Sequence, residues 1–267
     1  MDEEFNPVHK YENVRMELDG TVASIIFSRT HALNALDRAT ATEFLLCCQE
    51  AARNRSIRAL VLKAEGRAFG VGGDLASLRL DSVKAAAALI QPMHDAVRLL
   101  SSMDAPVIAS LHGYVAGGSL SLALACDLAV AADNTCFNLA YTNVGASGDV
   151  GSSWNLPRLV GLRNALEIAL LSENFDAATA LRLGMINRIV PAANLGHETM
   201  ALAKRLASGP TLAFGRMKRL MRDSFSHDFA SHLDAESVNF CESVATADFQ
   251  EAVDAFFAKR APVFQGR

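Results

Sequence analysis

Asp149 carries the carboxylate that the sequence places best for moving a proton. It lies in the run Gly-Ala-Ser-Gly-Asp-Val-Gly at residues 145–151, between glycines and just before an expected helix. A carboxylate on a loop can act as a general acid or base when its neighbours position it. Aspartate is also common in turns and as a helix N-cap, so both interpretations stay open on the residues alone.

Two glycine-rich corners are suited to holding a negatively charged oxygen. Residues 113–119, Gly-Tyr-Val-Ala-Gly-Gly-Ser, join a short β-like run to an apolar helix, and residues 69–75, Phe-Gly-Val-Gly-Gly-Asp-Leu, follow another β-like run. Glycine lets backbone N–H groups approach a ligand closely, and a helix N-terminus favours negative charge. One such corner is typical of a tight turn, whereas two provide the backbone donors that an oxyanion hole requires.

Three further side chains could assist the chemistry, although each has an ordinary structural explanation. His94 lies in an expected helix, four residues before Arg98, and histidine titrates near neutral pH, as an accessory acid or base must. His112 precedes the second glycine corner and is expected to pack or hydrogen-bond locally. Tyr141 could donate a phenol hydrogen bond in a pocket, and a core tyrosine explains it equally well.

Several common chemistries lack their sequence patterns. There is no G-x-S-x-G elbow, no G-x-G-x-x-G after a strand, no Walker A motif and no H-E-x-x-H. Serine hydrolysis, dinucleotide or ATP use and zinc catalysis are therefore not indicated. The net charge of −4, with scattered Lys and Arg, argues against a nucleic-acid partner.

The cysteines and the apolar segments predict a cytoplasmic protein. Five cysteines form neither a C-x-x-C pair nor a zinc pattern, and the acidic residues 1–4 do not resemble an export signal. We therefore expect reduced thiols. Asp127 interrupts the apolar stretch 115–132, which predicts a buried helix and strand and no membrane span.

Strands and helices alternate over the first two-thirds of the 267 residues, and the remainder is mostly helical. Strands are expected at 14–18, 22–28, 59–64, 107–111, 128–131 and 136–137. Helices are expected at 37–52, 82–102, 120–125, 152–160, 163–171, 176–183, 194–207, 211–224, 229–243 and 248–260. This order predicts an α/β protein with a helical tail that forms an interface or a lid.

Four segments resemble the crotonase, or enoyl-CoA hydratase/isomerase, superfamily. Residues 28–36 resemble its N-terminal CoA-binding loop, residues 69–75 its F-x-A-G-x-D-L corner, and residues 112–127 its second glycine corner. Residues 259–267 resemble its K-R-x-P-x-F-x-G-R tail. Together these segments span most of the chain and are far more specific than any one of them alone.

The resemblance implies a spiral of repeated β-β-α units, with a core at residues 1–195 and a helical oligomerisation region at 196–267. It also implies a homotrimer or hexamer acting on an acyl-CoA thioester in fatty-acid metabolism, with no metal and no cofactor besides the CoA of the substrate. The N–H groups of Val71 and Gly118 would form the oxyanion hole around the thioester carbonyl. The substrate-binding residues implied in this way are Ala32, Leu33, Gly72, Gly73, Asp74 and Tyr141.

The departures from the family pattern bear on the reaction. Hydratases of the family use two glutamates to activate water, and the matching positions here are Ser121 and Tyr141, which are poor bases near neutral pH. Asp149 falls where several isomerase-type members carry their working carboxylate. Residues 149–161 resemble the P-D-x-G-G-T-W-x-L-P-R segment of ring-opening epoxide isomerases and their relatives, with Gly148 in place of the proline.

These features predict an enoyl-CoA isomerase in which Asp149 moves a proton and thereby shifts a double bond. Three alternatives stay open. One is an enoyl-CoA hydratase, and another is an aryl-CoA dehalogenase or hydrolase with Asp149 as nucleophile and His94 as base. The third is an acyl-CoA-binding protein without catalysis.

Overall fold

The computed structural model describes residues 11–79 and 81–267, and the acidic residues 1–4 lie outside this part. The described chain begins with an antiparallel hairpin of β1 (Val14–Asp19) and β2 (Val22–Phe27), paired from Val14 opposite Phe27 to Asp19 opposite Val22. Gly20 forms the turn with a φ of 62°, which glycine adopts without strain. The predicted hairpin is confirmed.

The larger sheet has six strands in the order β1-β2-β3-β5-β7-β10. Its further strands are β3 (Ala59–Ala64), β5 (Val107–Leu111), β7 (Leu128–Ala132) and β10 (Arg188–Val190). All pairs after β1-β2 are parallel. These strands read as nearly continuous apolar runs because helices cover both faces of the sheet.

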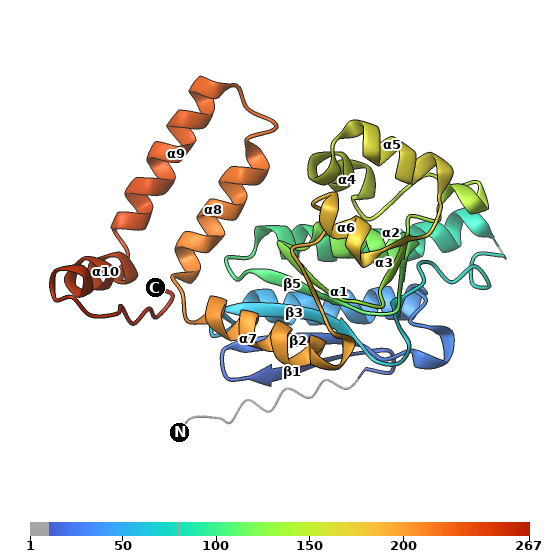
Figure 1. The fold of residues 1–267 in the computed structure, drawn as a ribbon, viewed down its shortest axis with the longest axis horizontal. Coiled ribbons are helices and arrows are strands. Elements are labelled where there is room, and N and C mark those ends of the chain that lie inside the picture. The colour runs from blue at the N-terminus through green and yellow to red at the C-terminus, as the bar shows by residue number, and fades with distance from the viewer. Residues whose placement is uncertain (1–10, 80) are drawn as a thin grey trace.

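Helices cover the two faces of this sheet with different sets of side chains. Leu60 and Leu62 pack with α1 (Arg38–Arg53) and α2 (Ser82–Ser102), whereas Val61 packs with α7 (Leu195–Ala207). This alternation is the two-residue period of a strand. Figure 1 shows α7 across the sheet from α1.

A smaller sheet of four strands has the order β4-β6-β8-β9. Its strands are β4 (Ala68–Gly70), β6 (Tyr114–Ala116), β8 (Cys136–Asn138) and β9 (Phe175–Asp176). The successive pairs β3-β4, β5-β6 and β7-β8 each contribute one strand to the larger sheet and one to the smaller sheet. The helices α2, α3 (Gly117–Ala125) and α4 (Ser152–Val160) follow these pairs in turn. The predicted spiral of β-β-α units is confirmed.

The rest of the chain is helical apart from β9, β10 and short turns. The remaining helices are α5 (Leu162–Leu171), α6 (Ala177–Arg182), α8 (Thr211–Asp223), α9 (Phe229–Val244) and α10 (Ala247–Phe257). Three 3₁₀ turns are η1 (Thr30–Ala32), η2 (Thr142–Val144) and η3 (Ala192–Asn194). Each of the five α-helices named in this paragraph begins and ends within three residues of its predicted bounds.

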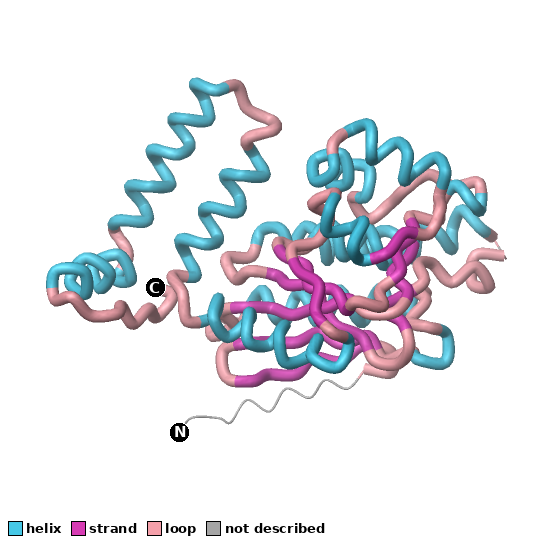
Figure 2. The backbone as a smooth tube through the Cα atoms, in the orientation of Figure 1, coloured by secondary structure: helices cyan, strands magenta, loops and turns pink. Residues whose placement is uncertain are grey.

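The C-terminal helices extend away from the sheets, with α8 and α9 forming a pair that ends in α10 (Figures 1 and 2). The sequence placed the boundary of this helical region after residue 195. In the structure, α7 begins at Leu195 and packs on the larger sheet, and the helices that project from the sheets are α8, α9 and α10. Within the described residues, no helix is long and apolar enough to cross a membrane.

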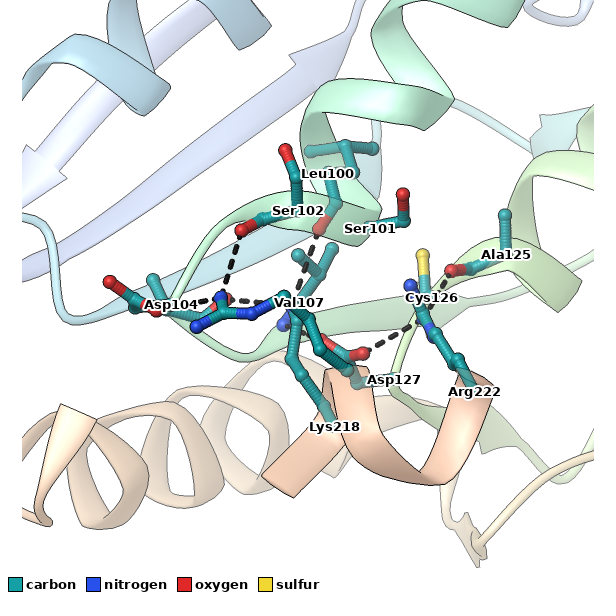
Figure 3. A network of polar contacts seen from close by, with 12 residues as sticks. Leu100, Ser101, Ser102, Asp104, Val107, Ala125, Cys126, Asp127, Lys218 and Arg222 are labelled. Carbon is teal, nitrogen blue, oxygen red and sulfur yellow. Dashed lines mark hydrogen bonds and ion pairs between the residues drawn. The ribbon is translucent and has the colours of Figure 1, made fainter. Parts of the chain in front are cut away.

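Asp127 fixes α8 to the spiral (Figure 3). Its carboxylate accepts hydrogen bonds from the Val107 amide at 2.8 Å, from Lys218 Nζ at 2.7 Å and from Arg222 at 2.8 Å. Lys218 also donates to the carbonyls of Leu100 and Ala105. Burial lowers the pKa of Lys218, and the neighbouring Asp127 only partly offsets that shift. The charged residue that interrupts the apolar stretch therefore anchors the C-terminal helices.

Candidate functional site

A cavity of about 610 Å³ lies where the two glycine corners meet α2 and the loop before α4. Six of the residues predicted to form the site line it: Val71, Gly72, Gly73, Gly118, Tyr141 and Asp149. His94 lines it as well, together with apolar residues including Leu36, Leu89 and Met93. Among the six predicted residues, Val71 and Asp149 are the furthest apart in the sequence, by 78 positions.

The two glycine corners touch each other at Gly72, which has a φ of 91°. A β-carbon at Gly72 would lie 3.2 Å from the Ala116 carbonyl oxygen and 3.2 Å from the Gly118 amide nitrogen. Only glycine combines this conformation with so close an approach. The amide of Gly72 also donates to Ser119 Oγ at 3.3 Å, which holds the corners together.

Gly118 is the second residue of α3, and the first amides of a helix have no acceptor within the helix. The helix dipole adds partial positive charge at this end. Val71 follows β4 and lines the same cavity. Val71 and Gly118, from two backbone segments, thus line one mostly apolar cavity. Backbone amides at such a place are suited to an oxygen that becomes negative during a reaction.

The Asp149 carboxylate lies beside the Gly118 corner. A β-carbon at Gly118 would lie 3.9 Å from Asp149 Oδ1 and 3.8 Å from Tyr141 Oη. The phenol of Tyr141 donates a hydrogen bond to Asp149 Oδ1 and is 2.8 Å from Ser121 Oγ. Among the described residues that line the cavity, Asp149 is the only one with an acidic side chain.

Tyr141 holds its proton more tightly than an ordinary tyrosine. Burial, the charge of Asp149 and the hydrogen bond to it together raise the pKa of Tyr141 well above 10. The phenol is therefore a hydrogen-bond donor and no proton acceptor near neutral pH. Ser121, fully buried, has its hydroxyl within 3.2 Å of the Gly117 carbonyl as well.

His94, on α2, contacts the same loop. The amide of Val150 donates to His94 Nε2 at 3.2 Å, so the ring touches the residue next to Asp149. His112, by contrast, does not line the cavity, and its Nε2 lies 3.1 Å from the Gly66 carbonyl oxygen. The partner of His112 is 46 positions away in the sequence, so this contact is not the local hydrogen bond expected.

The other predicted substrate-binding residues lie outside the cavity wall. Ala32 belongs to η1 and Leu33 follows it. Asp74 forms a 2.8 Å ion pair with Arg29 and accepts the Ala76 amide at 3.0 Å. Burial opposes ionisation of Asp74, but Arg29 and the neighbouring amides outweigh it, and the pKa of Asp74 lies below its usual value. Asp74 thus ties the first corner to the loop at 28–36, and substrate contact by these three residues stays a prediction.

Comparison with known proteins identifies the family of the chain. The sequence profile of the family described as enoyl-CoA hydratase/isomerase matches residues 17–267. The chain therefore belongs to the enoyl-CoA hydratase/isomerase family, the crotonase superfamily, whose members are acyl-CoA enzymes. Within the described residues, no cluster of three or more His, Cys, Asp or Glu side chains could hold a metal ion.

Relatives with similar sequence identity to this chain are named as different enzymes. A Rhodobacter capsulatus protein named "Probable enoyl-CoA hydratase" is 35% identical over 257 residues, covering 96% of this chain and 99% of its own length. The 1,2-epoxyphenylacetyl-CoA isomerase of Escherichia coli is 30% identical, covering 96% of this chain and 99% of its own. A 4-chlorobenzoyl coenzyme A dehalogenase of an Arthrobacter species is also 30% identical, covering 92% of this chain and 91% of its own length.

Solved structures match the whole fold. A crystal structure of a Mycobacterium abscessus protein superposes with a TM-score of 0.90 at 34% identity, covering 95% of this chain and 100% of that one. A crystal structure of a Streptomyces coelicolor protein superposes with a TM-score of 0.91 at 33% identity, covering 100% of this chain and 99% of that one. The family and the fold are common to all these proteins, whereas the reaction depends on the side chains of the cavity.

Proposed function

We propose that the protein is an enoyl-CoA isomerase. Asp149 removes a proton from the acyl chain beside the thioester, and the N–H groups of Val71 and Gly118 bind the resulting enolate oxygen. The same carboxyl group then returns the proton at another carbon, which shifts the double bond. The observation that carries the proposal is a single acidic side chain in the cavity, placed beside the Gly118 corner.

The composition of the cavity favours isomerisation over hydration. The resemblance puts Ser121 and Tyr141 where hydratases carry their two glutamates. Here both hydroxyl groups contact each other, and the phenol donates to Asp149. One carboxylate that reaches two carbons is enough to move a proton, whereas hydration also needs an activated water.

The proposal is tested with trans-3-hexenoyl-CoA in deuterated water, following the products by mass and by double-bond position. We expect the wild type to incorporate deuterium and to form the 2-enoyl thioester. Asp149→Asn should lose at least about 1,000-fold in rate, while hexanoyl-CoA still binds. Asp95→Asn, which makes the same change at an exposed position of α2, serves as the control and should keep the wild-type rate.

Two results would contradict the proposal. One is an Asp149→Asn variant that exchanges protons at the wild-type rate. The other is hydration of crotonyl-CoA that is faster than isomerisation of the 3-enoyl substrate and independent of Asp149. Saturable binding of hexanoyl-CoA without any turnover would instead indicate an acyl-CoA-binding protein.

A second candidate is dehalogenation of an aryl-CoA thioester. His94 lines the cavity beside the loop that carries Asp149, and the dehalogenase relatives are 30% identical. In this reaction the Asp149 carboxylate would displace chloride from the ring, and water activated by His94 would cleave the resulting ester. The Nε2 of His94, however, already accepts the Val150 amide. Intact-protein mass after quenching with 4-chlorobenzoyl-CoA would detect the ester on Asp149.

Assembly into trimers or hexamers in the cytoplasm is the remaining part of the proposal. The helices α9 and α10 expose large apolar side chains in the single chain, which include Phe229, Phe240, Phe256 and Phe257. Such side chains are typical of surfaces that become buried on association. Light scattering coupled to size-exclusion chromatography should give three or six times the 28.6 kDa of one chain.

A further inference from the structure

His94 reaches the site through a single hydrogen bond to the backbone of the Asp149 loop. It lies on α2, two positions after Pro92, and its Nε2 accepts the Val150 amide at 3.2 Å from 56 positions away in the sequence. A backbone N–H can only donate, so Nε2 must present its lone pair. The proton of the neutral ring therefore lies on Nδ1.

The residue that His94 holds has a strained backbone. Val150 has a φ of 50°, in the left-handed region that a β-branched residue rarely adopts. Such a conformation costs about 1–3 kcal/mol and persists only where the surroundings impose it. The side chain of Val150 is 2% exposed and packs in the same cluster as Leu89 and Met93 of α2. Packing fixes its side chain, and the His94 bond fixes its amide.

This strained residue directly follows Asp149. The Ser152 amide donates to the Asp149 carbonyl at 3.0 Å where α4 begins, so the chain turns sharply around Val150 and Gly151. Rotation of the Val150 amide would rotate the adjoining peptide unit and with it the Asp149 side chain. On the other side, Tyr141 holds the carboxylate itself. The carboxylate is thus anchored from two separate elements.

We propose that His94 is a positioning residue, which sets the direction of the Asp149 carboxylate by accepting the Val150 amide. The inference rests on the proposed function, in which Asp149 moves the proton. His94 takes no part in proton transfer in this role, because the nitrogen that faces the loop is already occupied. It requires only a hydrogen-bond acceptor at the place of Nε2.

Two substitutions separate positioning from acid–base chemistry. His94→Gln keeps an acceptor at about the reach of Nε2 but does not titrate near neutral pH, whereas His94→Leu keeps bulk and has no acceptor. Both residues are good helix formers. Arg98→Gln, at an exposed position one turn further along α2, serves as the control. Each variant is assayed with trans-3-hexenoyl-CoA for kcat and KM, and the exchange rate of the Val150 amide is measured by NMR or mass spectrometry.

We expect His94→Leu to lose about 100-fold in kcat with little change in KM, because a displacement of about 1 Å has that effect on a reacting group. The Val150 amide should exchange faster in this variant. His94→Gln should keep kcat within about threefold of the wild type and keep the protection of the Val150 amide, since its acceptor replaces Nε2. Arg98→Gln should match the wild type in both measurements.

Other results would overturn the inference. If His94→Gln is as slow as His94→Leu while the Val150 amide stays protected, the ring itself takes part in the chemistry. If both variants turn over at the wild-type rate, the contact does not position Asp149. A failure of the proposed function itself is recognised separately. In that case Asp149→Asn would still exchange substrate protons at the wild-type rate. The exchange rate of the Val150 amide would still show whether His94 holds that amide. If His94→Leu fails to fold, the His94→Gln kinetics and amide exchange decide.

Discussion

Tyr141 and Asp149 are joined side chain to side chain, with the phenol donating to Oδ1 of the carboxylate across eight positions of the chain. By family resemblance, Tyr141 stands where a hydratase carries its second glutamate. By the same resemblance Ser121 replaces the first glutamate, so the carboxylate of this cavity comes from a different position, Asp149. A donor of this kind fixes the orientation of the carboxylate, which a single acid–base residue needs.

Tyr141→Phe should slow turnover while leaving the fold intact. A hydrogen bond to a charged group is worth about 1.5–3 kcal/mol, so we expect kcat to fall by roughly 10- to 100-fold. The measurement is deuterium incorporation into trans-3-hexenoyl-CoA under saturation. Tyr11→Phe is the control, because Tyr11 packs against the core and is not among the residues that line the cavity. An unchanged kcat in Tyr141→Phe would show that the contact is not used.

The raised pKa of Tyr141 predicts the alkaline side of the pH profile. Burial, together with Asp149, keeps the phenol protonated beyond the usual value of about 10. The donor to Asp149 should therefore persist, and kcat should not fall with a midpoint near pH 10. Such a fall would contradict the prediction, provided that circular dichroism shows an intact fold at that pH.

The same shift has a consequence for stability. The unfolded chain loses the Tyr141 proton near pH 10, whereas the folded chain retains it to higher pH. The unfolded state then binds fewer protons, so the free energy of unfolding falls as pH rises through this window. The fall should be smaller in Tyr141→Phe than in the wild type, as urea titrations at pH 9 and pH 11 would measure.

Short-range patterns in the sequence predicted most of the fold and much of the site. The alternation of strands and helices and the two glycine corners are local signals, and Val71, Gly118 and Asp149 follow from the motifs that contain them. The sequence gives no strand signal for β4 or β6, because each has only three residues and lies beside or within a glycine corner. Three residues are too few to establish a two-residue period.

The contacts that position the carboxylate could not be predicted in this way. The Tyr141 phenol could donate to any acceptor in the pocket, and its bond to Asp149 depends on the turn at η2. His94 and Val150 meet only because the spiral brings α2 against the loop before α4. From the sequence alone Asp127 is a break in an apolar stretch, whereas its charged partners Lys218 and Arg222 lie 91 and 95 residues further along. Pairings at such separations depend on tertiary structure, which residue periodicity does not encode.

Gly148 stands where the family resemblance places a proline. We expect this position to accept a side chain only if the Ser152 side chain moves. A β-carbon at Gly148 would lie 2.3 Å from Ser152 Oγ, a buried hydroxyl with no hydrogen-bond partner in the described part of the chain. We expect Gly148→Ala to lower the free energy of unfolding by about 1–3 kcal/mol, as overpacking does. Ser152→Ala should be neutral or slightly stabilising, because it removes an unsatisfied hydroxyl. Urea denaturation measures both.

The double variant Gly148→Ala/Ser152→Ala tests the cause of that effect. With Oγ removed, the nearest side-chain atom is the Ser152 β-carbon at 3.6 Å, an ordinary contact. The double variant should therefore regain most of the stability lost in Gly148→Ala, giving a coupling above about 0.5 kcal/mol. Additive effects would mean that the backbone at Gly148, and not the clash with Ser152, sets the requirement for glycine.

Removal of the charge of Asp127 should destabilise the protein strongly. Asp127→Asn leaves Lys218, whose side chain is 11% exposed, without its carboxylate partner and weakens the bond to Arg222. A broken buried ion pair costs about 3–5 kcal/mol, because one charge stays buried without compensation. We expect a loss of this size in urea denaturation, whereas Lys84→Gln, at an exposed pair with Asp81, should change stability by less than about 1 kcal/mol. The double variant Asp127→Asn/Lys218→Met should recover part of the lost stability, because it removes the uncompensated charge as well. A loss below about 1 kcal/mol in the single variant Asp127→Asn would mean that the other contacts of α8 chiefly hold it in place.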